Sequence, residues 1–333
     1  MADARNSNAL QIVDPVLTNV ARLYSPSGFV YSQIAKRIPV ETRSAQYPTF
    51  SGFFGDDSDV GEQPIDDRSP TPEISFDWST DTFLVNDYRL KVSLTNTERK
   101  QAAANGDPLH LEMAKTKLLR DRMALRRELR LAAVLRATGN GGQLTGGTAT
   151  PSNKWDVDAA TIEADVETGA LAVRGKIGLV TNLMALDLAV AMKVARQQDI
   201  RDIVKYTVPG ERILAGGAQL PPILFGHRPL IADVTRNTAK KGATESLSTV
   251  WGNHVRLLYV PDEGGWGIPS VAYSFAAPID GAPAPEPGAQ GQYEVVDRYR
   301  TDDPPIEYIR AWEALDEKVC APDAGYELSN VLT

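Results

Sequence analysis

The sequence is poor in the residues that most often build disulfides, metal sites and catalytic centres. Its 333 residues include one cysteine, Cys320, and three histidines. A single cysteine excludes an internal disulfide and any site with several cysteine ligands, so we expect Cys320 to be a buried apolar residue. His110, His227 and His254 belong to no H-E-x-x-H motif and the chain has no G-x-S-x-G motif, so we interpret them as surface or hydrogen-bonded histidines. The sequence therefore indicates no catalytic residue, no metal ligand and no cofactor, and we do not expect an enzyme.

Long apolar runs and an excess of positive charge are also absent. No stretch approaches the roughly 20 apolar residues of a membrane span, and residues 1–10 are too polar for a signal peptide. The formal net charge is −8 and the isoelectric point is near 5.1. This balance argues against nucleic acid binding over the whole surface, although it leaves room for a local basic strip. We expect a soluble chain without a membrane partner.

The longest regular pattern runs from Asp107 to Gly139. Asp107 is a favourable N-cap, Pro108 suits the first helical turn, and Gly139 is the first glycine or proline after it. A helix of about 30 residues rises about 1.5 Å per residue and would reach roughly 45 Å. We therefore predict one long helix at the centre of the fold.

This helix is predicted to have two different faces. Apolar residues at steps of three, four and seven form one narrow stripe: Leu111, Ala114, Leu118, Leu125, Leu129 and Ala132. The opposite face carries more basic than acidic side chains: Lys117, Arg120, Arg126, Arg127 and Arg130 against Asp121 and Glu128. It is either an ordinary solvated face or a face that offers positive charge to a partner.

An acidic segment without a regular period occupies residues Ser51 to Pro72. It contains two aromatic and six acidic residues: Phe53, Phe54, Asp56, Asp57, Asp59, Glu62, Asp66 and Asp67. A calcium loop starting at Asp57 is not expected, because its twelfth position is Arg68 instead of the Glu that would bind the ion through both oxygens. The segment is interpreted as an acidic loop.

Alternating residues nearby predict strands at Ile74–Ser79 and Arg89–Leu94, and we expect a long hairpin with an acidic tip. A two-stranded hairpin is marginally stable alone, so we expect it to lean on another copy of the chain. There the acidic tip would face the basic side of the long helix. The candidate contacts between copies are Phe53, Phe54, Asp56, Asp57, Asp59, Glu62, Arg120, Arg126, Arg127 and Arg130.

The second half of the chain mixes helices and strands. Helices are expected near 158–174, 187–197 and 213–220, and strands at 229–234, 255–260, 270–275, 293–300 and 306–312. The link Gly139–Gly147 is glycine-rich, but it follows a helix and lacks a GK[ST] ending, so it is interpreted as a flexible loop. Because the elements do not alternate as βαβ units, the fold class is α+β.

The order of these parts resembles the major capsid protein of tailed bacteriophages, the Hong Kong 97-like fold. The resemblance covers nearly the whole chain and rests on these pieces: Asp14-Pro15 through Pro39-Val40, the Tyr47–Leu94 hairpin, Asp107-Pro108-Leu109, Asn182-Leu183-Met184, Asp199–Asp202, Leu257–Pro261 and Gly325–Asn330. It implies an N-terminal arm (1–28), the start of a peripheral domain (29–46) and an extended β-hairpin loop (47–94). It further implies a peripheral domain (95–150) with a spine helix at about 108–138, an axial domain (151–290), return strands of the peripheral domain (291–318) and a C-terminal segment near the axial domain (319–333).

The resemblance also implies a function. Such a chain self-assembles into hexamers and pentamers of an icosahedral virion shell, which forms in the host bacterial cytoplasm and encloses double-stranded DNA without sequence-specific binding. The implied partners are further copies of the chain, a separate scaffolding protein, a portal and a decoration protein. No lysine lies between Lys36 and Lys91, so a covalent cross-link from a lysine of the extended loop is not expected. An encapsulin-like compartment that holds cargo enzymes shares the fold and is the alternative.

Overall fold

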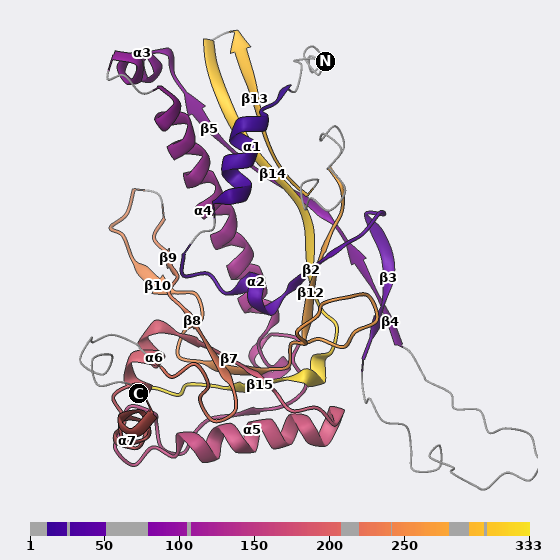
Figure 1. Cartoon of the computed structure of the whole chain (residues 1–333), viewed down its shortest axis with the longest axis vertical. Coiled ribbons are helices and arrows are strands. Elements are labelled where there is room, and N and C mark those ends of the chain that lie inside the picture. Colours follow the sequence, from indigo (N-terminus) through magenta and orange to yellow (C-terminus); the bar gives the residue numbers. More distant parts are fainter. Residues whose placement is uncertain are drawn as a thin grey trace, which may run out of the picture.

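The computed structural model describes residues 12–24, 27–50, 79–104, 108–207, 220–240, 242–279, 293–302 and 305–333. In its upper part, the long helix α4 (Pro108–Val134) stands beside the long strands β13 (Glu294–Asp302) and β14 (Pro305–Val319) (Figure 1). A second sheet lies below, with helix α5 (Ile162–Ile177) along its lower face (Figure 1). The fold is therefore mixed helix and sheet, as the sequence predicted.

The upper sheet is organised around β14. Its strands follow the order β1 (Ile12–Val13), β13, β14, β12 (Ala272–Ala276) and β2 (Lys36–Pro39), and β5 (Asn86–Leu94) also pairs with β14. β14 is 15 residues long: residues 307–313 pair with both β13 and β5, and residues 315–319 pair with β12. Helix α1 (Pro15–Leu23) follows β1 directly, and the Asp14 carboxylate accepts a hydrogen bond from the Leu17 N–H at 3.0 Å as its N-cap.

The described strands near the predicted hairpin pair as follows. β3 (Ser44–Thr49) pairs with β4 (Ser79–Leu84), whereas β5 is antiparallel to β14 with Leu90 opposite Ala311. The predicted strand 74–79 lies, except for Ser79, outside the described residues, so its pairing with 89–94 stays a prediction. Alternation of polar and apolar residues indicates a half-buried strand but carries no information about its partner. The acidic segment itself lies within residues 51–78, outside the described residues.

The lower sheet has the order β6 (Thr148–Ala149), β15 (Gly325–Leu328), β11 (Val255–Leu258), β7 (Leu183–Asp187) and β8 (Arg228–Ala232). β7, β11 and β15 are buried along their whole lengths. Helices α6 (Leu188–Val194) and α7 (Gln198–Thr207) follow β7, and Asp187 caps α6 by accepting a hydrogen bond from the Ala189 N–H at 3.0 Å. The last strand of the chain, β15, lies inside the lower sheet, between β6 and β11.

Three apolar clusters fill the interior. The largest surrounds the lower sheet and contains Trp155 and Trp251. A second joins β12 to the β3–β4 hairpin, where the Phe83 and Phe275 rings stack with centroids 4.6 Å apart. The third includes Leu17 and lies between α1, α4 and the upper sheet. The remaining elements are α2 (Tyr31–Ile34), α3 (Asn96–Ala104), β9 (Thr235–Asn237), β10 (Leu247–Thr249) and the 3-10 turns η1 (Thr138–Asn140) and η2 (Pro322–Ala324).

Most predicted elements in the described residues are found near their expected positions. The helix expected at 158–174 begins later, at Ile162 after the cap residue Thr161. The helix expected at 213–220 falls almost entirely outside the described residues. The glycine-rich link is not a loose loop: the Ala137 N–H and the Asn140 side-chain amide donate to the buried Glu327 carboxylate at 2.6 and 3.0 Å. As expected, Cys320 is buried.

Candidate subunit interface

The buried face of α4 is not the predicted apolar stripe. Leu118, a member of that stripe, is 50% exposed, whereas its neighbour Leu119 is 5% exposed and Met123 is 2% exposed. The buried face also contains charged groups, including Glu112 and Arg127. The stripe prediction fails because it assigns the buried face of α4 from the spacing of apolar residues alone. This helix also buries charged side chains, which pair with residues of the upper sheet.

The middle of α4 is joined to the upper sheet through Glu294. The Glu294 carboxylate on β13 accepts hydrogen bonds from Arg120 at 2.6 Å and from Arg37 at 2.5 Å, one on each oxygen. Burial alone would raise the pKa of Glu294, but the charges of Arg120 and Arg37 outweigh it and lower the pKa to about 2. This carboxylate is therefore held in its ionised form between two guanidinium groups.

The next turns of α4 are joined to β14 through Glu317. Arg130 donates from Nε and Nη2 to the two carboxylate oxygens at 2.9 and 3.0 Å. The Arg127 Nε lies 3.4 Å from the same carboxylate but is not aligned for a hydrogen bond, while its Nη2 donates to the Ser274 hydroxyl at 2.9 Å. The fork geometry of Arg130 fixes both distance and orientation. We call the contacts of Glu294 and Glu317 with α4 the ion-pair seam.

Glu313 lies beside these contacts, but its carboxylate is farther from a cation than those of Glu294 and Glu317. It is 3% exposed, and its closest described cation is Arg120, at 3.9 Å. Burial raises the pKa of Glu313, and the charge of Glu294 adds to this effect against the opposing charge of Arg127. Glu294 and Glu313 are both largely buried, yet the pKa of Glu294 is lowered and that of Glu313 is raised.

Three residues of the predicted basic face of α4 have partners within the protomer. Arg120, Arg127 and Arg130 form ion pairs with Glu294 or Glu317, and their contact with a neighbouring copy stays a prediction. Arg126 is different, because it is exposed on the helix surface. Lys117 is also exposed, with its ammonium 5.5 Å from the centre of the Tyr24 ring. Sequence reasoning could not separate these cases because paired and solvated arginines have the same spacing on a helix.

The other candidate contacts cannot be placed. Phe53, Phe54, Asp56, Asp57, Asp59 and Glu62 lie within 51–78, outside the described residues. Their proposed contact with a second copy stays a prediction. The base of their hairpin is anchored, since the buried Tyr47 of β3 packs against Phe275 and donates a hydrogen bond to Asp81 of β4 at 3.0 Å.

A buried carboxylate that sequence reasoning missed ties three segments together. Glu128 of α4 is 0% exposed and accepts hydrogen bonds from the Trp251 indole at 2.6 Å and from the Tyr31 N–H at 2.9 Å. The Val30 N–H donates to it at 3.3 Å. Burial raises the pKa of Glu128, and the hydrogen bonds from Trp251 and the backbone oppose that effect. Glu128 thus replaces water as the partner of the N–H groups that open α2.

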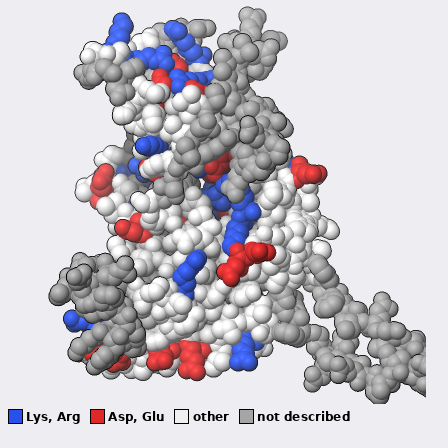
Figure 2. All heavy atoms as spheres, in the orientation of Figure 1, with Lys and Arg blue, Asp and Glu red and all other residues white. Residues whose placement is uncertain are grey.

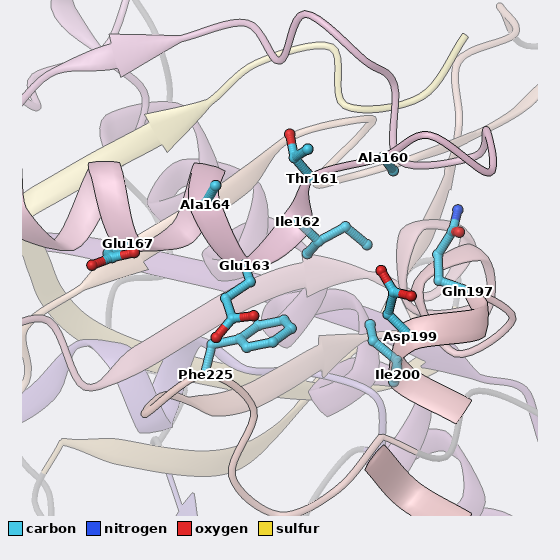
Figure 3. A pocket seen from close by; sticks show the side chains of 10 residues that line it. All are labelled: Ala160, Thr161, Ile162, Glu163, Ala164, Glu167, Gln197, Asp199, Ile200 and Phe225. Carbon is cyan, nitrogen blue, oxygen red and sulfur yellow. The ribbon is translucent and has the colours of Figure 1, made fainter. Parts of the chain in front are cut away.

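A separate pocket of about 360 Å³ opens between α5, α7 and Phe225. Figure 3 shows Glu163 of α5 beside the Phe225 ring and Asp199 of α7 beside Ile200. The described residues that line it include three carboxylates, the Thr161 hydroxyl, the Gln197 amide and apolar groups.

In the part of the chain that is described, no group of three or more His, Cys, Asp or Glu side chains could hold a metal ion. No described helix is long and apolar enough to cross a membrane. Figure 2 shows basic and acidic side chains next to one another on the described part of one face.

Two relatives match the chain from end to end. The chain is 24% identical over 335 residues to the major capsid protein of Pseudomonas phage JBD67, covering 98% of this chain and 99% of that protein. It is 25% identical over 338 residues to the major capsid protein of Burkholderia phage BcepMu, covering 97% of each. A comparison with models of protein families finds no match.

Solved structures share the fold. A phage-related protein from Bordetella bronchiseptica matches with a TM-score of 0.66 at 17% identity, covering 96% of this chain and 98% of that one. The capsid of cyanophage P-SCSP1u matches with a TM-score of 0.55 at 12% identity, covering 92% of each chain. A holo-encapsulin complex from Synechococcus elongatus gives a TM-score of 0.53 at 13% identity, covering 97% of this chain and 98% of that one. The predicted resemblance to phage major capsid proteins, and with it the role of a capsid shell protein, is confirmed by the named relatives and by the fold.

Proposed function

We propose that the chain is the major capsid protein of a tailed phage with the Hong Kong 97-like fold. It forms hexamers and pentamers that close into an icosahedral shell around double-stranded DNA. The observation that carries the proposal is the similarity to named major capsid proteins over 97–98% of the chain. End-to-end similarity matters here, because a shell protein uses its whole length to contact its neighbours.

The described elements suit the domains of this fold. α4 with β5, β13 and β14 would form the peripheral domain, and the lower sheet with α5, α6 and α7 would form the axial domain. Residues 1–28 would be the N-terminal arm, and 47–94 the extended loop, with the β3–β4 pair at its base. Residues 291–318 would return to the peripheral domain, and 319–333 would lie near the axial domain. β15 supports the last assignment, since it pairs with β11 of the lower sheet.

In this proposal, α4 and the two sheets form a rigid frame, and other segments extend from it to neighbouring copies. The ion-pair seam and the Glu128 contacts lock α4 to the sheets, so α4 moves with the frame. Residues 51–72 would reach a neighbouring copy, with Arg126 as an exposed partner for their acidic side chains. A closed shell of identical chains requires contacts that repeat by symmetry, and an extended segment can bend to suit hexamers and pentamers.

The proposal includes partners and a location. A separate scaffolding protein, a portal and a decoration protein would assemble with the shell in the host bacterial cytoplasm. The shell would enclose DNA without sequence-specific binding, and the net charge of −8 and the internally paired seam arginines disfavour strong contact with the phosphates. The shell would have no catalytic activity of its own.

Deleting Ser51 to Pro72 tests the role of the reaching segment. The deletion variant should give soluble protomers or rings that do not form shells, as judged by size exclusion and electron microscopy. A variant in which the same 22 residues, 51 to 72, are replaced by glycine and serine controls for loop length. Normal shells from either variant would refute the proposed role of the segment.

An encapsulin-like compartment is the alternative, and the fold shared with the Synechococcus elongatus complex is what favours it. The two functions differ in content, because a phage head holds nucleic acid and a compartment holds protein cargo. Particles purified from the native source should therefore contain DNA that resists added nuclease until the shell is opened. Particles that contain a defined protein and no nucleic acid would support the compartment.

A further inference from the structure

A cationic pocket of about 320 Å³ lies beside the C-terminal half of α4. It is bounded by α4, by the strand β9 and by residues 250–256. Its charged lining consists of Arg136, Arg236 and Arg256, together with His254. None of the described residues that line it is acidic. This grouping cannot be read from the sequence, because the four residues come from three separate segments.

Arg256 is the most unusual member of the pocket. It is 1% exposed, and its guanidinium stacks over the Trp251 ring at 4.6 Å. Its Nη2 donates to the Ala132 carbonyl at 3.3 Å, but its Nε and Nη1 find no hydrogen-bond acceptor in the described structure. A buried guanidinium with two unpaired donors is costly, and such donors normally have a partner.

The neighbouring carboxylates do not satisfy these donors. One oxygen of the buried Glu327 accepts hydrogen bonds from the glycine-rich link, and the other lies 3.8 Å from the Arg136 Nε and 3.3 Å from the His254 Nδ1. Neither of those contacts is aligned as a hydrogen bond. Burial lowers the pKa of Arg256 to about 10, although the Glu327 charge opposes that effect. Positive charge in the pocket therefore exceeds the negative charge around it.

The unpaired donors define what could enter. Unpaired guanidinium donors match the oxygens of a carboxylate or a phosphate. The fork that Arg130 makes uses Nε and Nη2, so the free Nε and Nη1 of Arg256 lie on different edges of the group and each requires its own acceptor oxygen. The volume accommodates a small oxyanion or the end of an acidic side chain. The phosphates of a DNA duplex would stay at the protein surface. Arg256 is 1% exposed, so a DNA backbone at the surface would not reach it. An inserted side chain fits this depth better.

We propose that this pocket is an oxyanion site, and that an acidic side chain from residues 51–72 of a second copy fills it in the assembled shell. The second half of the proposal rests on the proposed function. Charge complementarity selects the occupant, since this segment has a single basic residue, Arg68, against six acidic ones: Asp56, Asp57, Asp59, Glu62, Asp66 and Asp67. The site lies near the end of α4, beyond the arginines of the ion-pair seam.

Inorganic phosphate tests the oxyanion site in the unassembled full-length chain. Phosphate should raise the melting temperature more than chloride at the same ionic strength, because an anion bound only by the folded state stabilises it. Arg236→Ala, at an exposed position of the pocket, should remove at least half of this rise. Arg122→Ala, at an exposed position of α4 outside the lining, should keep it. Equal responses of the wild type and Arg236→Ala would overturn the site.

Disulfide trapping between two differently tagged chains tests the occupant. One chain carries Ala133→Cys, an exposed pocket position. The other carries a single substitution of the acidic segment: Asp56→Cys, Asp57→Cys, Asp59→Cys, Glu62→Cys, Asp66→Cys or Asp67→Cys. The native Cys320 is buried and should not react. At least one pair should give a mixed dimer severalfold above the level seen with Ala114→Cys, an exposed control on α4.

The outcomes separate this proposal from the proposed function. Shells that form without any mixed dimer would overturn the acidic occupant and leave the capsid function standing. Failure of the wild type to form shells would count against the capsid function, while the phosphate measurement would still decide the oxyanion site. Loss of packaged nucleic acid in Arg236→Ala shells, without a mixed dimer, would assign the pocket to nucleic acid phosphate and overturn the carboxylate.

Discussion

Replacing Glu294 by glutamine is the most direct test of the ion-pair seam. Glu294 is the shared partner of Arg37 and Arg120, so Glu294→Gln removes the counter-charge of two guanidinium groups at once. The pKa of Glu294 lies at about 2, against an ordinary value of 4.5. At about 1.4 kcal/mol per pH unit, this corresponds to roughly 3 kcal/mol of stabilisation of the folded state. We expect Glu294→Gln to lower the free energy of unfolding by about that amount.

The pH dependence gives this prediction a signature of its own. The Glu294 pKa is lower in the folded than in the unfolded chain, so its contribution is present above about pH 4.5 and is lost as the pH falls toward 2. Urea unfolding followed by tryptophan fluorescence should therefore show a difference between wild type and Glu294→Gln that shrinks between about pH 5 and pH 3. Glu167→Gln, at an exposed position, should stay within about 0.5 kcal/mol of wild type.

Two results would refute the reasoning. If Glu294→Gln is as stable as the wild type at neutral pH, the two arginines are solvated in the protein and the seam adds no stability. A large loss of stability that stays constant from neutral to acidic pH would show that packing, and not charge, is what the substitution removes. Both measurements use the unassembled protomer, so that shell contacts do not contribute.

Three further predictions concern α4 and the buried thiol. Leu119→Ala should destabilise the protomer by about 3 kcal/mol and Leu118→Ala by less than about 1 kcal/mol, because only Leu119 is buried; equal losses in urea unfolding would restore the predicted stripe. Arg130→Ala should lower the midpoint of urea unfolding, because it removes an ion pair with Glu317. Arg126→Ala, at an exposed position, should leave that midpoint unchanged and reduce the yield of shells. The reverse pattern would show that the unpaired charge is at Arg130. Burial raises the pKa of Cys320 to about 12, so alkylation at pH 8, measured by mass spectrometry, should require unfolding, and rapid labelling of the folded chain would contradict this.

Local features of the fold could be predicted from the sequence. The spine helix follows from the absence of glycine and proline over its length, and α4 covers most of the predicted range. Asp187 was predicted at the start of a helix, and it caps α6. The strands at 255–260 and 270–275 are found as β11 and β12. Each of these depends on neighbouring residues, which is the information that a spacing pattern contains.

Partners far apart in the chain could not be predicted in the same way. β5 pairs with a strand more than 200 residues later, and alternation within either strand does not name the other. Likewise, Arg127 and Arg130 look like solvated residues on a helix until Glu317 is placed beside them. One signal was present: Glu313 and Glu317 share a face of β14 with Ile309, Ala311 and Leu315, and buried carboxylates need cationic partners. The sequence contains no comparable signal for the oxyanion pocket, because its arginines are far apart in the chain and come together only in the folded structure.

The central claim is best tested by electron microscopy and size exclusion of the full-length chain, expressed alone and with a candidate scaffolding protein. The account predicts closed particles, or rings of five and six copies that become closed particles when the scaffolding protein is present. A monodisperse monomer or dimer under both conditions would contradict it, and would leave the acidic segment and the cationic pocket without the second copy that each is proposed to meet.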